Sequence, residues 1–330
     1  MEDDKEIEMS PLSASKIKKL EDCSWAYWAA YHLKLPDSSN DGARRGTICH
    51  LVFECLLNPR HLKNYKKIIK KKSIEGDEGC LRLVKKHMAA EGIDTADNYL
   101  LIDQMIVTGL KSDFFVKGGE LIGVEIQFDI KNEEPTYYIR GFIDKANKVG
   151  NKAFIDDYKS SKEKYEGEEH ESNVQAMMYS LAFKKKFPDL EPEVRFVFLR
   201  FPDEPMVKVK FNEDTLKGFE HYLAKVQKKI DSFSEMDAIK NFAFHNKKPE
   251  GFKGYLMCGF AKYPGQLKKD GSPMYACSAK FPLKYFVLKD SNNKTLKSSF
   301  KNNFKLKDGE KVLEMSYAGC PVHRPPIDVF

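Results

Sequence analysis

The 330-residue sequence lacks any apolar run near the roughly 20 residues that a transmembrane helix needs, so we expect no membrane partner. It also lacks a secretory signal at its start, which reads Met-Glu-Asp-Asp-Lys-Glu instead of basic and then apolar. The seven cysteines are odd in number and scattered, which speaks against a disulfide framework. These absences predict a cytoplasmic protein whose thiols are reduced or bind metal.

The net charge of +6 is unevenly distributed along the chain. Residues 241–330 contain 16 basic and seven acidic residues, a balance of +9, which leaves −3 for the first 240 residues. This excess favours an anionic partner. The change in composition predicts a boundary near residue 240, and a change in hydrophobic period near residue 121 divides the rest. This gives a helical N-terminal part (1–120), a strand-containing core (121–240) and a basic C-terminal subdomain (241–330) that could bind metal.

The hydrophobic pattern changes its period near residue 121. Alternating apolar and polar residues predict strands over 124–130, 137–146 and 152–159, joined by short turns as an antiparallel meander. A helix is expected over 172–187, a strand over 193–201 and a helix over 214–230. Upstream, one helix capped by Ser13 or Ser15 is expected to continue through Trp28, and another to begin near Arg45. The order predicts an α/β fold.

Two acidic residues lie near the ends of neighbouring predicted strands. Asp157 and Lys159 are two residues apart, so their side chains emerge on one face of the third strand. With Asp144 on the second strand, two carboxylates would form the oxygen site that suits Mg²⁺ or Mn²⁺. The lysine could orient or deprotonate a water molecule. A structural ion pair at a strand end is the alternative for the Asp-x-Lys sequence by itself.

Further residues surround this set in a fixed order: His50, Glu125, Gly141-Phe142-Ile143-Asp144, Ile155-Asp156-Asp157-Tyr158-Lys159 and Gln175-x-x-x-Tyr179. Together they resemble the PD-(D/E)XK nuclease superfamily, and within it the RecB-type nucleases, which include AddB-like and CRISPR-associated exonucleases. The resemblance implies a restriction-endonuclease-like core, in which helices flank a mixed central sheet. It also implies metal-dependent cleavage of DNA, with residues 121–240 as the catalytic core. We expect an exonuclease rather than an endonuclease.

The resemblance implies roles for individual residues. His50, Asp144 and Asp157 would bind the metal, and Lys159 would be the catalytic lysine. The remaining catalytic positions would be an acid on the first strand and two residues one helical turn apart that face the active site: Glu125, Gln175 and Tyr179. Asp156 should face away from Asp157, because side chains alternate along a strand.

A second group of possible ligands comprises four cysteines. Ser13, Ser15, Leu20 and Cys23 resemble the family motif that precedes three late cysteines, and the four family cysteines bind a [4Fe-4S] cluster. Here the late cysteines Cys258, Cys277 and Cys320 are separated by 18 and 42 residues, unlike the family spacing. Alternatively, these three and His323 form a tetrahedral zinc site. In a third interpretation no cysteine binds metal and Cys23 packs beside Trp25.

The expected partner is DNA, either single-stranded or at duplex ends. Lysines and aromatic residues interleave in residues 241–330, which suits single-stranded nucleic acid, although those aromatics could instead form the core of a small β-rich subdomain. The sequence contains no ATP-binding Gly-x-x-x-x-Gly-Lys-Ser/Thr motif, so a helicase or recombination motor would be a separate protein. The resemblance implies a role in recombination, repair or phage DNA metabolism, in the cytoplasm of a bacterial or phage-infected host cell. The alternative is a nucleic-acid-binding or structural component of a recombination complex on a catalytically silent nuclease fold.

Overall fold

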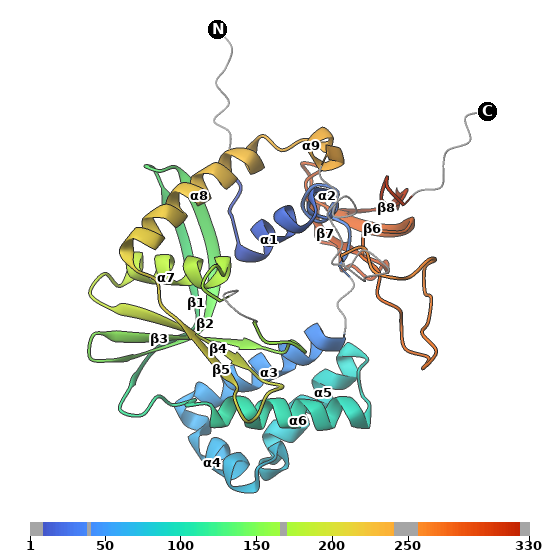
Figure 1. Cartoon of the computed structure of the whole chain (residues 1–330). Helices are drawn as coiled ribbons and strands as arrows, with labels where there is room; N and C mark the ends of the chain where they lie inside the picture. Colours follow the sequence, from blue (N-terminus) through green and yellow to red (C-terminus); the bar gives the residue numbers. More distant parts are fainter. Residues whose placement is uncertain (1–8, 38–40, 166–169, 241–256, 324–330) are drawn as a thin grey trace, which may run out of the picture. The chain divides into compact units, whose positions relative to one another are not determined.

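The computed structural model describes residues 9–37, 41–165, 170–240 and 257–323 (Figure 1). Contacts divide the chain into two compact units. The first comprises Met1–Ala14 and Ser39–Lys228, and the second comprises Ser15–Ser38 and Lys229–Phe330. An N-terminal segment therefore belongs to the same unit as the C-terminal region. The three-part division drawn from composition remains a prediction.

The first unit begins with helices whose ends follow local capping rules. They are α3 (Asp41–Leu57), α4 (Leu62–Lys71), α5 (Glu78–Glu91) and α6 (Ala96–Lys111). The Asp77 carboxylate caps α5 by accepting the Cys80 N–H, and the Thr95 hydroxyl caps α6 in the same way. Gly92 ends α5 with a φ of 67°, a left-handed conformation that glycine adopts without strain.

A five-stranded mixed sheet follows these helices, with the strands in the order β1-β2-β3-β4-β5. The strands are β1 (Glu120–Asn132), β2 (Tyr137–Val149), β3 (Lys152–Lys159), β4 (Glu191–Phe198) and β5 (Met206–Val209). Only β3 and β4 pair in parallel, and α7 (Val174–Lys186) makes the crossover between them. The long helix α8 (Glu213–Asp231) comes after β5.

Helices cover the sheet of the first unit on both sides. In Figure 1, α3, α4, α5 and α6 lie on one side of the strands, while α7 and α8 lie on the other. The hydrophobic core on the α3 side combines helix residues with side chains from β3, β4 and the residue after β4, among them Phe53, Ile106, Tyr158, Val197 and Leu199. The active-site candidates are therefore carried by a sheet that is packed from both faces.

The second unit is built from two distant parts of the chain. Its helices are α1 (Ala14–Asp22), which begins at the boundary between the units, α2 (Ser24–Tyr31) and α9 (Glu235–Lys240). Its antiparallel sheet has the order β7-β6-β8, formed by β6 (Leu283–Lys289), β7 (Thr295–Ser299) and β8 (Lys311–Tyr317). Trp25 Nε1 donates to the Tyr317 hydroxyl at 2.6 Å, which links the N-terminal segment to this sheet.

The predicted fold class is confirmed: helices flank a mixed sheet and precede it in the chain. The single helix expected through Trp28 is wrong, because Cys23 adopts an extended conformation (φ −163°) and separates α1 from α2. The sequence pattern predicts neither the strand β5 nor the individual strands of the second unit's sheet. No described helix is long and apolar enough to cross a membrane.

Candidate functional site

The candidate site lies where β2 and β3 stop pairing. The described register runs from Val149 opposite Lys152 to Lys145 opposite Asp156. Beyond that point the Tyr158 N–H donates to Asp144 Oδ2 at 3.0 Å, and the Tyr158 carbonyl oxygen lies 3.0 Å from His50 Nε2. The Asp144 and His50 side chains thus bond to the N–H and the carbonyl of Tyr158, which would otherwise continue the ladder between β2 and β3. The strands diverge, and polar side chains enter the gap.

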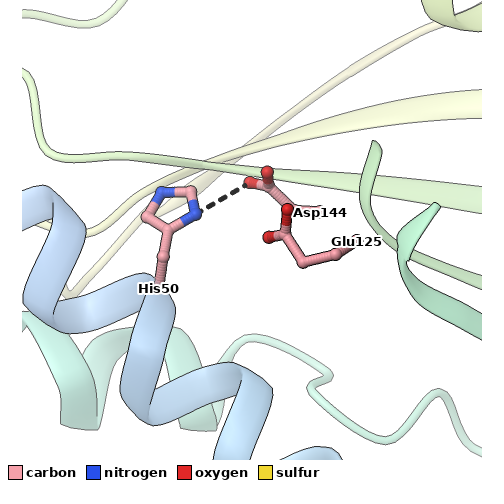
Figure 2. A group of neighbouring side chains, drawn as sticks. All are labelled: His50, Glu125 and Asp144. Carbon is pink, nitrogen blue, oxygen red and sulfur yellow. Dashed lines mark ion pairs between the residues drawn. The ribbon is translucent and has the colours of Figure 1, made fainter. Parts of the chain in front are cut away.

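His50 has the geometry of a metal ligand. Since the Tyr158 carbonyl can only accept, His50 Nε2 must donate, and the neutral ring then has a free lone pair on Nδ1. That Nδ1 atom lies 3.4 Å from Asp144 Oδ2 (Figure 2). Metal-binding histidines commonly donate their other ring N–H to a backbone carbonyl in this way. The hydrogen bond to Tyr158 therefore presents Nδ1 to the site.

Glu125 completes a group of three possible ligands. Donor atoms of His50, Glu125 and Asp144 all lie within 4.8 Å of one another, and in the part of the chain that the structure describes no other group of three is as close (Figure 2). Glu125 has a φ of 47°, a left-handed conformation that is rare for residues other than glycine. Such strain costs about 1–3 kcal/mol and clusters at functional sites. One imidazole nitrogen and two carboxylates form a donor set that fits a divalent cation.

Electrostatics at this site also favour a cation. Burial and the neighbouring charge of Asp157 raise the pKa of Asp144 to about 7, although His50 and the Tyr158 N–H act in the opposite direction. Burial likewise raises the pKa of Glu125. Negative charges crowded into a partly dry site are unfavourable by themselves. A bound divalent cation would relieve this repulsion.

Asp157 and Lys159 form a second cluster with two residues of α7. Lys159 Nζ lies 2.7 Å from Asp157 Oδ2 and donates to Gln175 Oε1 at 2.6 Å. Gln175 Nε2 donates to Asp157 Oδ1 at 3.0 Å and to the Tyr179 hydroxyl at 2.7 Å. Burial would lower the pKa of Lys159, but the Asp157 carboxylate outweighs it and the net shift is upward. Lys159 is therefore held in place as a cation.

Asp156 takes no part in either cluster. Its carboxylate pairs with Lys145 and Arg195 and is almost fully buried. The expected metal set of His50, Asp144 and Asp157 thus differs from the observed donor group, in which Glu125 stands in place of Asp157. Asp157 stays a predicted ligand, since its charge acts directly on Asp144.

Comparison with known families agrees with this geometry. A model of the PD-(D/E)XK nuclease superfamily matches residues 11–259, which include every strand of the first unit. The chain belongs to this superfamily. The mixed sheet with its flanking helices is consistent with a restriction-endonuclease-like fold.

Other comparisons with this nuclease-superfamily chain add little. A solved structure described as protein VC1899 from Vibrio cholerae is 14% identical, with a TM-score of 0.22. The match covers 66% of this chain and 58% of that protein, so the chain spans less than two thirds of its length. No curated protein matches the sequence.

The four cysteines of the proposed cluster belong to the second unit. Burial raises the pKa of Cys320 to about 11, and the thiols of Cys23, Cys258 and Cys277 also contribute. Cys277 N donates to the Cys258 carbonyl at 3.2 Å, and His323 N donates to the Cys320 carbonyl at 2.9 Å. All seven cysteines of the chain are free. Thiols that are hundreds of residues apart in sequence therefore interact electrostatically in one neighbourhood.

Sequence reasoning missed two features of the site. Glu125 was expected only as an acidic position on the first strand, because no local pattern reveals that a glutamate has positive φ. The Tyr158 backbone was not considered at all, since its side chain belongs to the core. The only available clue to either was the position of the acids near the ends of predicted strands.

We predict that Glu125→Gln weakens Mn²⁺ binding at least about tenfold, because removal of a ligand should cost no less than removal of an outer-shell partner. Isothermal titration calorimetry measures this change directly. The matched control is Glu54→Gln, which neutralises an exposed acid on α3 that acts electrostatically on Glu125 but lies outside the donor group. Equal losses in both variants would mean that only net charge matters, and no loss in Glu125→Gln would remove it from the ligand set.

Proposed function

We propose that the chain is a Mg²⁺- or Mn²⁺-dependent deoxyribonuclease of RecB type that acts as an exonuclease. The observation that carries this proposal is the convergence of His50 Nδ1 with the Glu125 and Asp144 carboxylates, next to a lysine that stays charged. The ordered motifs that resemble RecB-type nucleases support the finer assignment. Its role would be in DNA recombination, repair or phage DNA metabolism.

We assign the residues of the site to two roles, metal binding and orientation of the attacking water. His50, Glu125 and Asp144 would hold the divalent cation, with Asp157 as a further proposed ligand. A cation bound there would stabilise charge that develops on the scissile phosphate. Lys159, fixed by Asp157 and Gln175, would orient the attacking water and offset negative charge as a donor. Its raised pKa favours orientation over proton abstraction.

A finger in the second unit, residues 258–277, is suited to holding single-stranded DNA. It is closed at its base by the hydrogen bond from Cys277 to Cys258 and has a bridge between Leu267 and Pro273. Tyr263 and Tyr275 on it are 60% and 53% exposed, whereas Tyr285 and Tyr317 in the adjoining sheet are core residues. The finger also carries three exposed lysines: Lys262, Lys268 and Lys269. Exposed rings and cations together match the bases and phosphates of a single strand.

The remaining basic residues of the C-terminal region partly lie in 241–256 and 324–330, outside the described residues. The finger therefore accounts for only part of the DNA binding that is expected of residues 241–330. Of the aromatic residues of this region, Tyr285 on β6 and Tyr317 on β8 are buried, Phe286 on β6 is half-buried, and Tyr263 and Tyr275 of the finger are exposed.

We also propose that Cys23, Cys258, Cys277 and Cys320 hold a [4Fe-4S] cluster. The support is the resemblance to the family motif and the membership of all four cysteines in one unit, in which Cys23 acts on the pKa of each of the other three thiols. Zinc bound by the three late cysteines and His323 is the alternative.

The free thiols are compatible with a reducing cytoplasm, which we propose as the location. A separate helicase or recombination protein would supply any motor. The competing function is DNA binding on a silent nuclease fold. The intact set of Asp144, Asp157 and Lys159 favours an active site instead.

We predict that Asp144→Asn and Lys159→Met each lower the cleavage rate at least about 100-fold, because each removes a group that stabilises developing charge. End-labelled single- and double-stranded DNA with Mg²⁺ or Mn²⁺ provides the assay, and a binding assay with EDTA should show nearly unchanged affinity. Lys152→Met, at the exposed other end of β3, is the control. Full activity in either site variant would refute the catalytic assignment.

The thiol proposal predicts a coloured protein. Anaerobic purification should give a broad absorption band near ~400 nm, and Cys320→Ser should remove it, because a cluster requires its thiolate ligands. Cys49→Ser, at a buried thiol of α3, controls for nonspecific damage and should leave the band intact. A colourless wild-type protein that contains stoichiometric zinc would contradict the cluster and favour the zinc site.

The finger proposal predicts that Tyr263→Ala and Tyr275→Ala each weaken binding of a single-stranded oligonucleotide by about 1–3 kcal/mol. Substituting Lys268 and Lys269 by Gln should reduce the salt dependence of binding. Phe300→Ala is the control, because Phe300 is 45% exposed in the same unit but lies outside the finger. An equal loss in the control, or no loss in the tyrosine variants, would contradict the proposal.

A further inference from the structure

A second charged cluster lies on the sheet directly next to the candidate site. Lys145, Asp156 and Arg195 are paired across β2, β3 and β4 in one row of the register. Their exposed fractions are 0%, 1% and 2%. Each of the first two is adjacent in sequence to a site carboxylate, Asp144 or Asp157. Because side chains alternate, the cluster occupies the face opposite those carboxylates.

The cluster is closely bonded. Asp156 accepts from Arg195 Nε at 2.5 Å and from Arg195 Nη2 at 2.9 Å, which makes the pair bidentate. Lys145 Nζ lies 2.5 Å from Asp156 Oδ2 and donates to the Phe114 carbonyl at 2.6 Å. Arg195 Nη1 also reaches Asp113, whose side chain is 45% exposed. The donors of both cations, from β2 and β4, are therefore directed at defined acceptors on β3 and on the segment after α6.

The position of this cluster matters more than its strength. Lys145 and Asp156 form the last described pair of the β2–β3 ladder, immediately before the strands diverge at Asp144 and Tyr158. At that point backbone hydrogen bonds no longer hold the two strands together. The ion pair ties them across the opposite face at the same place. It thus lies where the fork begins.

Stability alone is a poor explanation for such a cluster. Transferring charged groups into the interior costs several kcal/mol per ion, and apolar side chains of similar volume are often as stable or more stable. Apolar packing cannot supply the directional, bidentate geometry that an arginine and a carboxylate impose. A cluster that is costly but geometrically specific, located at the fork, has the properties of a positioning device.

We propose that Lys145, Asp156 and Arg195 are positioning residues that hold the fork of β2 and β3, so that the Asp144 and Asp157 carboxylates converge for metal binding. The part of the inference that concerns cleavage rests on the proposed nuclease function. The part that concerns metal affinity does not. None of the three side chains touches the metal ligands' face of the sheet.

The test is a triple variant, Lys145→Met, Asp156→Leu and Arg195→Met, which removes the charges together and leaves Asp113 free to be solvated. We expect cooperative thermal unfolding to persist, because no buried charge is left unpaired. Mn²⁺ affinity should nevertheless fall about 10- to 100-fold, as for the loss of outer-shell partners. Cleavage should show a lower kcat with an unchanged KM for DNA.

Arg195→Lys is the conservative variant, since it keeps the charge and loses the planar fork of donors. It should weaken Mn²⁺ binding less than the triple variant, and it replaces that variant if the latter does not fold. Lys208→Met is the control, because the exposed Lys208 lies opposite Arg195 on β5. It should leave Mn²⁺ binding unchanged.

A folded triple variant with wild-type Mn²⁺ affinity would overturn the proposal, as would an unfolded triple variant together with an unaffected Arg195→Lys protein. If the wild-type protein binds Mn²⁺ but cleaves no DNA, the nuclease function fails by itself. The affinity comparison then still decides whether the cluster positions the ligands.

Discussion

The two hydrogen bonds at the Tyr158 backbone are the interactions on which the site depends. Its N–H and carbonyl are bonded to the Asp144 and His50 side chains instead of a neighbouring strand. These bonds separate β2 from β3, fix the tautomer of the imidazole and aim a carboxylate at its free nitrogen. The same bonds satisfy backbone groups that would otherwise be costly to leave unpaired in a partly buried place. The same two hydrogen bonds therefore both end the pairing of β2 with β3 and orient the candidate metal ligands His50 and Asp144.

Around this fork, the sheet separates two kinds of charge. One row of side chains, Glu125, Asp144 and Asp157, is rich in carboxylates and needs a cation. The row before it, on the opposite face, is internally compensated by Lys145, Asp156 and Arg195. Site residues and compensated residues are neighbours on both β2 and β3. If either strand moves, side chains of both sets therefore move with it. The acidic site is thus attached to a rigid element, although its own charges repel.

Much of the first unit could be predicted from alternation and period. The pattern over residues 152–159 coincides with β3, and the two-residue spacing of Asp157 and Lys159 placed both on one face. Features set by long-range contacts could not be predicted. Neither the left-handed backbone of Glu125 nor the extended break at Cys23 has a local cause in residue type. Likewise, the +9 balance of the last 90 residues could not distinguish core aromatics from the exposed ones of the finger.

The central claim is that His50, Glu125 and Asp144 together bind one divalent cation. An anomalous difference map from crystals grown with MnCl₂ tests it most directly, because manganese scatters anomalously and protein atoms scarcely do. We expect a strong peak in contact with His50 Nδ1 and with carboxylate oxygens of Glu125 and Asp144. Manganese bound elsewhere, with no peak at these three side chains, would contradict it.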